Sequence, residues 1–300
     1  MKQAHSPQIT VIIPTFNRAW VLAKAVDSVL EQTLRPEEII VVDDGSTDET
    51  PELLAAYGDS IRVLTQPNQG VSAARNRAIR YSSGDFIALL DSDDSWRPEK
   101  LACQMDFFFD HPDAMICQTQ ETWIRNGRRV NPMHKHAKPS GMIFEPSLHR
   151  CLVSPSAVMM KKAVFDLKGM FNPDFTVCED YDLWLRISTD IPIYLIDRPL
   201  IIKYGGHDDQ LSRSHSQDRY RIASLLHLVQ SGALSREQKA AATAVLQEKC
   251  RIYGNGCKKR GKNAEARNYL TLYAQLSGTE LEKAAGCNRR ILHPGDDTNQ

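Results

Sequence analysis

The stretch Phe86-Ile87-Ala88-Leu89-Leu90-Asp91-Ser92-Asp93-Asp94-Ser95-Trp96 joins a short apolar run to three carboxylates within four residues. The apolar run, residues 86–90, is typical of a strand that is buried on both faces. Carboxylates placed directly after such a strand can hold a divalent cation against a phosphorylated ligand, because Mg2+ is usually bound by one or two carboxylates and substrate phosphates. The alternative is an ordinary Asp/Ser-rich turn with an Asp that caps the next helix.

The same arrangement occurs twice earlier in the chain. Residues 9–13 and 39–42 are runs of Ile, Val and Thr, and each is followed by a polar turn, Pro14 to Asn17 in one case and Asp43-Asp44 in the other. Helical patterns separate the runs, which predicts β-α-β units and a parallel sheet with helices on both faces. Ligands bind beyond the carboxyl ends of the strands in such sheets. The three polar turns therefore predict one site at one edge of the sheet.

The remaining pattern predicts an α/β domain followed by helices. Further strands are expected at residues 61–64, 115–122, 123–125, 128–130, 156–160, 193–196 and 200–204, and helices at 72–81, 98–109 and 179–187. After residue 214 the pattern is helical, at 220–231, 236–253, 262–277 and 279–285, with glycines 254, 256, 261 and 278 as boundaries. We expect a first domain at 1–213, a helical region at 214–292 and a disordered tail at 293–300.

Composition limits the classes of binding partner and the cellular compartment that we expect. Lys plus Arg and Asp plus Glu both number 37, so nothing favours nucleic acid or an anionic membrane as a global electrostatic partner. The seven cysteines are scattered without a C-x-x-C pair, which fits a reducing compartment. The chain shows neither a signal-peptide pattern nor about 18 successive apolar residues. We expect a cytoplasmic protein, and any membrane association would be peripheral, at the inner face.

Five motifs resemble those of family 2 glycosyltransferases of the GT-A fold, of the type that builds bacterial surface polysaccharides. They occur in the family's order over roughly residues 9–210, at 11–18 (VIIPTFNR), 41–50 (VVDDGSTDET), 68–76 (NQGVSAARN), 90–94 (LDSDD) and 179–186 (EDYDLWLR). A lone D-x-D would be a weak signal, whereas five ordered motifs are a strong one. The helices after residue 214 lie outside the resemblance and could have an acceptor or assembly role, including homo-oligomer formation.

The resemblance implies a nucleotide-binding set at the strand ends. Its members would contact the nucleoside, the diphosphate or the donor sugar, and Asp44 would accept a hydrogen bond from the base. They are Pro14, Thr15, Asn17, Asp44, Arg75, Asp91 and Ser92. Helix capping or an Asx turn is the alternative for Asp43 and Asp44, and Asp48 is the better capping candidate.

The resemblance also implies a metal and a general base. Asp93 would bind Mg2+ or Mn2+, with Asp94 nearby and His207 as a further ligand, although a histidine in a surface loop is an equally good reading of His207. Asp180 would be the base that activates the acceptor hydroxyl, with Glu179 as the second candidate. Trp184 lies one helical turn beyond Asp180 and is expected in the core rather than against a sugar.

Together these implications describe an inverting, metal-dependent glycosyltransferase. It would move a sugar from a nucleoside-diphosphate donor, with UDP favoured, to a hydroxyl of a glycan or lipid-linked glycan. One rival is a sugar-nucleotide nucleotidyltransferase, which calls for a Gly-rich phosphate loop that is missing after residue 13. The other rival is a non-catalytic nucleotide-sugar or glycan-binding module, which would not need Asp180.

Overall fold

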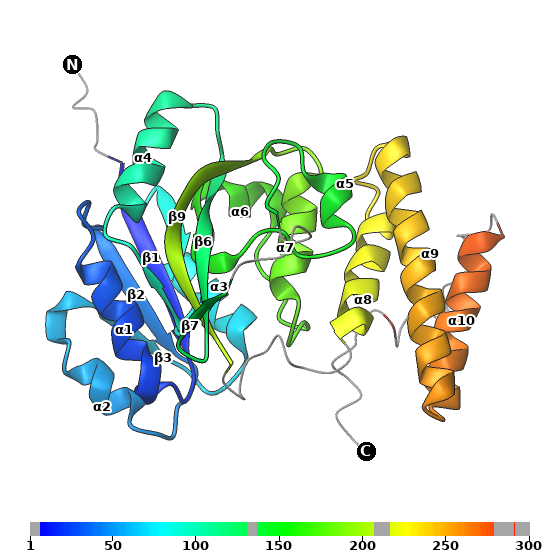
Figure 1. Cartoon of the computed structure of the whole chain (residues 1–300), viewed down its shortest axis with the longest axis horizontal. Coiled ribbons are helices and arrows are strands. Elements are labelled where there is room, and N and C mark those ends of the chain that lie inside the picture. Colours follow the sequence, from blue (N-terminus) through cyan, green and yellow to red (C-terminus); the bar gives the residue numbers. More distant parts are fainter. Residues whose placement is uncertain (1–6, 131–136, 207–216, 279–290, 292–300) are drawn as a thin grey trace. The chain divides into compact units, whose positions relative to one another are not determined.

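The computed structural model describes residues 7–130, 137–206, 217–278 and 291 (Figure 1). The chain forms two compact units, and we describe each by itself. The first unit consists of residues 1–143, 152–173 and 190–210, and the second of residues 144–151, 174–189 and 211–300. The expected domain boundary at residue 213 and the tail at 293–300 lie outside the described residues.

The first unit is built on one twisted sheet with the order β3-β2-β1-β4-β8-β6-β9-β5, and β7 pairs with β6. The strands are β1 (Ile9–Thr15), β2 (Glu38–Asp43), β3 (Arg62–Thr65), β4 (Phe86–Leu89), β5 (Asp94–Trp96), β6 (Ile116–Arg125), β7 (Arg128–Val130), β8 (Val158–Lys161) and β9 (Ile193–Gly205). Strands β1 to β4 pair in parallel, as do β6 and β9, while β8, β5 and β7 pair antiparallel to their neighbours. The α/β class and the largely parallel sheet are confirmed.

Helices connect the parallel strands and bury their apolar side against the sheet. They are α1 (Ala19–Leu30), α2 (Thr50–Ala55), α3 (Val71–Tyr81), α4 (Lys100–Asp110) and α6 (Ala163–Lys168), with 3-10 turns η1 (Gly58–Ser60) and η3 (Pro155–Ala157). The i, i+3, i+4 spacing of apolar residues in α1 places Leu22, Val26 and Val29 fully out of solvent. They join Val11 and Ile13 of β1 in one core cluster. This packing fixes the carboxyl ends of β1, β2 and β4 at one edge of the sheet.

Two sequence expectations about this unit were wrong in detail, and one short strand was not expected. The expected pairs of strands at 115–125 and 193–204 are each one continuous strand, β6 and β9. These two strands pair along their length, and register shifts around Gln120 absorb the irregularity opposite Pro199. The strand that was not expected is β5, which residues Asp94–Trp96 form against β9. A three-residue strand has no periodicity that a sequence could show.

The second unit is helical. Its elements are α5 (Phe144–Ser147), α7 (Glu179–Ser188), α8 (Gln217–Gln230), α9 (Arg236–Lys259) and α10 (Asn263–Ser277). Helices α8, α9 and α10 lie side by side in Figure 1, and a shared cluster packs Tyr181 and Leu185 of α7 against Leu225 of α8. Helix α7 therefore has its apolar partners among the C-terminal helices.

The expected end of the long helix near residue 253 was also wrong. Helix α9 continues through Gly254 and Gly256 to Lys259. At Gly254 the missing side chain lets α10 approach closely, because a Cβ there would lie 2.8 Å from Cγ of Leu270. Packing of the two helices thus outweighs the low helix propensity of glycine. None of the described helices combines the length and apolar character needed to cross a membrane.

Candidate active site

The turns after β1 and β2 are tied to each other by side-chain hydrogen bonds. The backbone N–H of Asn17 donates to Oγ of Ser46 at 2.8 Å, and Oδ1 of Asn17 accepts from the backbone N–H of Thr47 at 2.7 Å. Asn17 has a left-handed backbone with φ 52°, which asparagine tolerates better than most residues. Its role in nucleoside binding remains a prediction. Its observed role is to join the loops after β1 and β2.

Asp48 bonds to the first residues of two helices, α2, which follows it in sequence, and α1, which precedes it. Its Oδ2 accepts from the backbone N–H of Ala19 at the start of α1, and its Oδ1 accepts from the backbone N–H of Thr50. Burial raises the pKa of Asp48, but the hydrogen bonds from Thr50 and Ala19 outweigh it, so the pKa lies below its ordinary value. The carboxylate thus fixes the N-terminus of α1 against the β2 turn.

Asp44 organises the segment that precedes α3. Its Oδ1 accepts hydrogen bonds from Nε2 of Gln66 at 2.7 Å and from the backbone N–H of Gln69 at 3.0 Å, while its Oδ2 accepts from the backbone N–H of Gly70 at 2.7 Å. Gly70 has φ 86°, a conformation that favours glycine. Three of the roughly four lone-pair positions of the carboxylate are thus used. Asp44 is itself buried, and its bond to a nucleobase remains a prediction.

The nearly buried Arg75 and the partly exposed Asp91 form an ion pair at the end of β4. The Arg75 side chain is 3% exposed, and its Nη2 lies 2.7 Å from Oδ1 of Asp91. The guanidinium also lies 5.0 Å from the ring centroid of Phe171. This charge-assisted bond ties the turn after β4 to helix α3. Two members of the predicted nucleotide-binding set are therefore in direct contact.

Ser156 connects the first and last carboxylates of the acid cluster. Its Oγ accepts from the backbone N–H of Asp91 at 3.1 Å and donates to Oδ2 of Asp94 at 2.6 Å. Asp94 is 2% exposed. Burial raises its pKa, Asp91 and Asp93 add to the rise, and Lys203 opposes it. The buried Asp94 thus ties the turn after β4, through Ser156, to η3, the 3-10 turn that precedes β8.

Lys203 of β9 supplies a half-buried positive charge next to Asp94 of the acid cluster. Its Nζ donates to Oγ of Ser154 at 3.1 Å. Burial alone would lower its pKa, but Asp94 and Glu121 outweigh burial and hold the pKa above its ordinary value. Glu121 in turn accepts from Lys138 Nζ at 2.9 Å. This set of paired charges is the kind of network that buried ions require.

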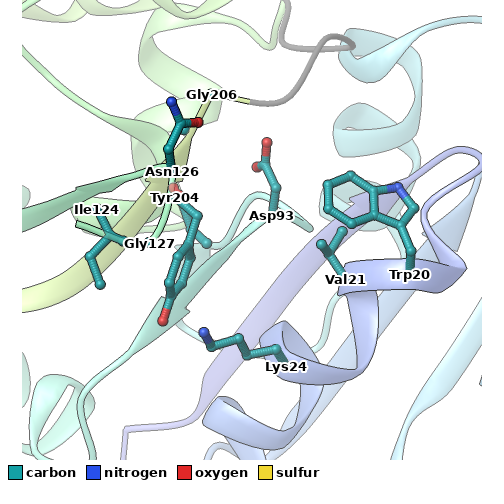
Figure 2. A pocket seen from close by; sticks show the side chains of 11 residues that line it. Trp20, Val21, Lys24, Asp93, Ile124, Asn126, Gly127, Tyr204 and Gly206 are labelled. Atoms are coloured by element: carbon teal, nitrogen blue, oxygen red, sulfur yellow. The ribbon is translucent and has the colours of Figure 1, made fainter. Parts of the chain in front are cut away.

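Asp93 is the partly exposed carboxylate of the acid cluster that borders a cavity. Asp91 has a comparable exposure but is paired with Arg75 and does not line that cavity. The Asp93 side chain is 21% exposed, and its Oδ2 lies 3.6 Å from Nη1 of Arg18. It borders a cavity of about 410 Å3 between α1, the β6–β7 turn and the end of β9. Figure 2 shows its carboxylate projecting between Trp20 and Asn126. A partly exposed carboxylate at the edge of a cavity fits a divalent cation that is shared with substrate phosphates.

The other predicted donor residues occupy the expected strand ends. Pro14 and Thr15 close β1 and are buried, and Ser92 is buried within the turn after β4. His207, the predicted third metal ligand, lies outside the described residues. Its predecessors Gly205 and Gly206 end β9 and border the same cavity as Asp93.

Asp180 and Glu179 begin helix α7 in the second unit. Oδ2 of Asp180 accepts from Sγ of Cys151 at 3.3 Å, and its Oδ1 accepts from the backbone N–H of Tyr181 at 2.7 Å. Asp180 is partly exposed, whereas Glu179 is 6% exposed. Cys178 precedes them with a left-handed backbone at φ 62°, which is a strained conformation for cysteine and is common at functional sites.

Two neighbours of Asp180 have structural roles. Asp182 is buried and pairs with Arg186 Nη2 at 2.9 Å, and its Oδ1 accepts from Oγ of Ser224 at 3.0 Å. Trp184 is 2% exposed, which confirms the expected core position. Among the acids of α7, Asp180 is therefore the one with an accessible carboxylate and without an ion pair in the described contacts.

Sequence reasoning missed several residues that shape the acid cluster. Arg18 belongs to the quoted motif at 11–18 but was given no role, and its contact with Asp93 depends on the loop after β1. Ser156 and Lys203 are distant in sequence from Asp94 and carry no motif. Only the pairing of β9 with β5 and of β8 with β4 brings these residues together.

Comparison with known proteins identifies the family. The model of "Glycosyl transferase family 2" matches residues 10–167, so the chain belongs to this family. An uncharacterized glycosyltransferase of Rickettsia conorii is 32% identical over 69% of this chain, which spans only 35% of that relative. The Escherichia coli protein WfgD, a "UDP-Glc:alpha-D-GlcNAc-diphosphoundecaprenol beta-1,3-glucosyltransferase", is 32% identical over 63% of this chain and 73% of its own length.

A solved structure has the same fold. TarS of S. aureus, residues 1–349 in complex with UDP-GlcNAc, superposes with a TM-score of 0.71 at 19% identity. The superposition covers 90% of this chain and 81% of TarS. This likeness confirms the expected GT-A-like fold of the chain.

Proposed function

We propose that this protein is an inverting glycosyltransferase of surface-polysaccharide or glycolipid assembly. It would act in the cytoplasm on a nucleoside-diphosphate sugar, with UDP favoured, and a hydroxyl of a glycan or lipid-linked glycan. The family supports the reaction class, and the names of the relatives support the substrates: WfgD uses UDP-Glc and a lipid-linked GlcNAc, and TarS binds UDP-GlcNAc. The observation that carries the proposal is the acid cluster at the end of β4, in which the partly exposed Asp93 borders a cavity.

The proposed chemistry is a single displacement. The acceptor oxygen attacks the anomeric carbon, the bond from that carbon to the diphosphate oxygen breaks, and its electron pair leaves with the diphosphate. Asp180 takes the proton of the acceptor hydroxyl, and attack from the opposite face inverts the anomeric centre. Arg18 and Arg75 place positive charge at the rim where the diphosphate would lie. The rival nucleotidyltransferase and binding-module hypotheses predict no sugar transfer at all.

Asp93 would hold Mg2+ or Mn2+, with His207 as a candidate second ligand. Such an ion supplies Lewis-acid stabilisation of the leaving phosphates when it is bound. Asp93 is favoured over Asp94, because Asp94 is buried and hydrogen-bonded to Ser156. The Asp91 carboxylate is bound to Arg75 and would instead orient the donor.

The experiment is a turnover assay with a panel of nucleotide sugars, Mg2+ or Mn2+, and a GlcNAc-diphosphate lipid acceptor. Asp93→Asn should reduce kcat at least about 100-fold, as loss of a transition-state electrostatic contact does, while Asp106→Asn, an exposed acid on α4, should not. Asp180→Asn should abolish transfer but leave UDP binding by calorimetry intact. Normal turnover in excess chelator would remove the metal from the proposal, and normal turnover of the Asp180 variant would move the base to Glu179.

The C-terminal helices are the proposed contact with a membrane. The exposed residues Lys258 and Lys259 end α9, and Arg260 and Lys262 follow in the turn to α10. A basic run attracts anionic lipid by about 1 kcal/mol per charge near the surface. Co-sedimentation with phosphatidylglycerol vesicles tests this, and equal pelleting with neutral vesicles would contradict it. Homo-oligomer formation through these helices belongs to the same proposal, and analytical ultracentrifugation checks it.

A further inference from the structure

The cavity beside Asp93 is not explained by the donor residues. Of the predicted nucleotide-binding set, Pro14, Thr15, Asn17, Asp44, Arg75, Asp91 and Ser92, none is among its lining residues. Its walls come instead from the first turns of α1, the β6–β7 turn and the end of β9. Only Asp93 and Asp94 are shared with the predicted metal site. The cavity and the nucleotide-binding set therefore meet at Asp93 but are lined by different side chains.

The walls combine an exposed aromatic surface with a few polar groups. Trp20 is 59% exposed although it is a large apolar residue. Figure 2 shows its indole on one side of the cavity, with Ile124 and Asn126 on the other and Lys24 below. A volume of about 410 Å3 falls within the usual range of about 300–1,000 Å3 for small-molecule sites. Aromatic rings with one polar edge are suited to ligands that have an apolar face and a hydroxyl rim.

Two of the polar groups are held in position. The Lys24 ammonium lies 3.6 Å from the ring centroid of Tyr204, and the Tyr204 hydroxyl accepts a 3.4 Å hydrogen bond from Oγ of Ser95. Asn126 has φ 49° in the β6–β7 turn, and a Cβ at position 206 would clash with its Oδ1, so Gly206 permits this approach. Lys24 of α1 is therefore held by Tyr204 of β9, and Asn126 by the tight β6–β7 turn.

We propose that this cavity is the acceptor subsite and that it binds a pyranose ring of the acceptor glycan. The ring would stack its C–H face on the Trp20 indole, and its hydroxyls would bond to Lys24 and Asn126. One hydroxyl would then point toward Asp93, where the donor diphosphate is proposed to lie. This inference rests on the proposed glycosyltransferase function and names the part of the site that selects the acceptor.

A nucleoside is the competing occupant, because a base could also stack on an indole. The two occupants predict different effects of Trp20→Ala. If the cavity binds the acceptor, the variant keeps its affinity for UDP and loses sugar binding. If it binds the nucleoside, the variant loses affinity for UDP. Because Trp20 is mostly exposed on α1, its replacement leaves the core untouched.

The test is saturation-transfer-difference NMR on the full chain with UDP and Mg2+. The probes are the methyl glycosides of glucose, galactose, N-acetylglucosamine and N-acetylgalactosamine. At least one should receive saturation from the protein, and Trp20→Ala should weaken its binding about 10-fold, which is 1.4 kcal/mol. Phe109→Ala is the matched control, because Phe109 is a 65% exposed aromatic on α4 that does not line the cavity.

Three outcomes overturn the inference: no probe binds the wild type, Trp20→Ala binds the probe unchanged, or Trp20→Ala loses UDP affinity by calorimetry. Failure of the proposed function is a separate result, because it would be absence of UDP binding and of sugar transfer in the wild type itself. Lys24→Met gives a second measure. It should weaken the same probe without changing UDP affinity, and an unchanged probe affinity would remove Lys24 from the subsite.

Discussion

At the scale of single residues, position in the acid cluster decides what each carboxylate can do. Asp91 is bound by the nearly buried Arg75, Asp94 is buried against Ser156, and the partly exposed Asp93 borders the cavity. A one-residue step along the chain thus separates a structural acid from a candidate metal ligand. The reason is that the turn leads into strand β5, whose pairing with β9 draws Asp94 inward.

Lys100 shows the cost of a buried charge away from the site. It is fully buried on α4, where its Nζ donates to Oε1 of Gln104 at 2.6 Å and lies 3.8 Å from the Trp96 ring centroid. Burial lowers its pKa from 10.5 to about 7. The unfolded chain therefore binds more protons than the folded one between about pH 7 and 10.5, so this lysine makes the free energy of unfolding rise with pH over that window.

We expect Lys100→Met to remove this pH dependence. The variant's gain in the free energy of unfolding over the wild type should be larger at pH 7 than at pH 9.5. The difference should be on the order of 3 kcal/mol, which follows from the pKa difference. Loss of the bond to Gln104 subtracts about 1–3 kcal/mol at both pH values and leaves the difference unchanged. Urea unfolding at the two pH values measures it. Lys239→Met, at an exposed position on α9, is the control, and equal pH profiles for Lys100→Met and wild type would refute the prediction.

At the scale of elements, close packing decides where helices end. Helix α9 passes through two glycines because the groove at Gly254 receives Leu270 of α10. At Gly256 a Cβ would instead lie 3.2 Å from Nη1 of Arg260, at the flexible end of that side chain. The two glycines thus have the same propensity and different surroundings, which makes them a matched pair.

We expect the two alanine substitutions to have opposite effects. Gly256→Ala should stabilise the chain by up to about 1 kcal/mol, because alanine is the better helix former and Arg260 can move. Gly254→Ala should destabilise it by about 1–2 kcal/mol, because overpacking against Leu270 outweighs the same gain. Thermal unfolding followed by circular dichroism at 222 nm gives both values. A Tm for Gly254→Ala at or above that of Gly256→Ala would contradict the packing argument.

At the scale of the whole molecule, the C-terminal helices belong to the folding of the motif region. Helix α7 carries the family motif and the candidate base Asp180, yet its buried residues Tyr181 and Leu185 pack in one cluster with Ile222 and Leu225 of α8. The resemblance to the family ends before α8, but the core that holds α7 does not. The helices are therefore part of what orients the base.

We expect a chain cut after residue 213 to fail as an independent domain. Removing α8 exposes the apolar side of α7, and each large side chain lost from the core costs about 1.5–3 kcal/mol. The truncated chain should aggregate or unfold well below the full chain by differential scanning calorimetry and size-exclusion chromatography. A soluble fragment with the Tm of the full chain would show instead that residues 214–300 are an appendage.

The sequence by itself determined the order of elements, the family and the edge of the sheet where the acids gather. Those features follow from local signals: β-branched runs, helical spacing and motifs contained in short stretches. The sequence could not separate Asp93 from Asp94, find Lys203 and Ser156 next to Asp94, or show that Asp44 holds a loop. Tertiary structure decided these points, because burial and hydrogen bonding depend on strands β5, β8 and β9, whose pairing joins residues far apart in the chain.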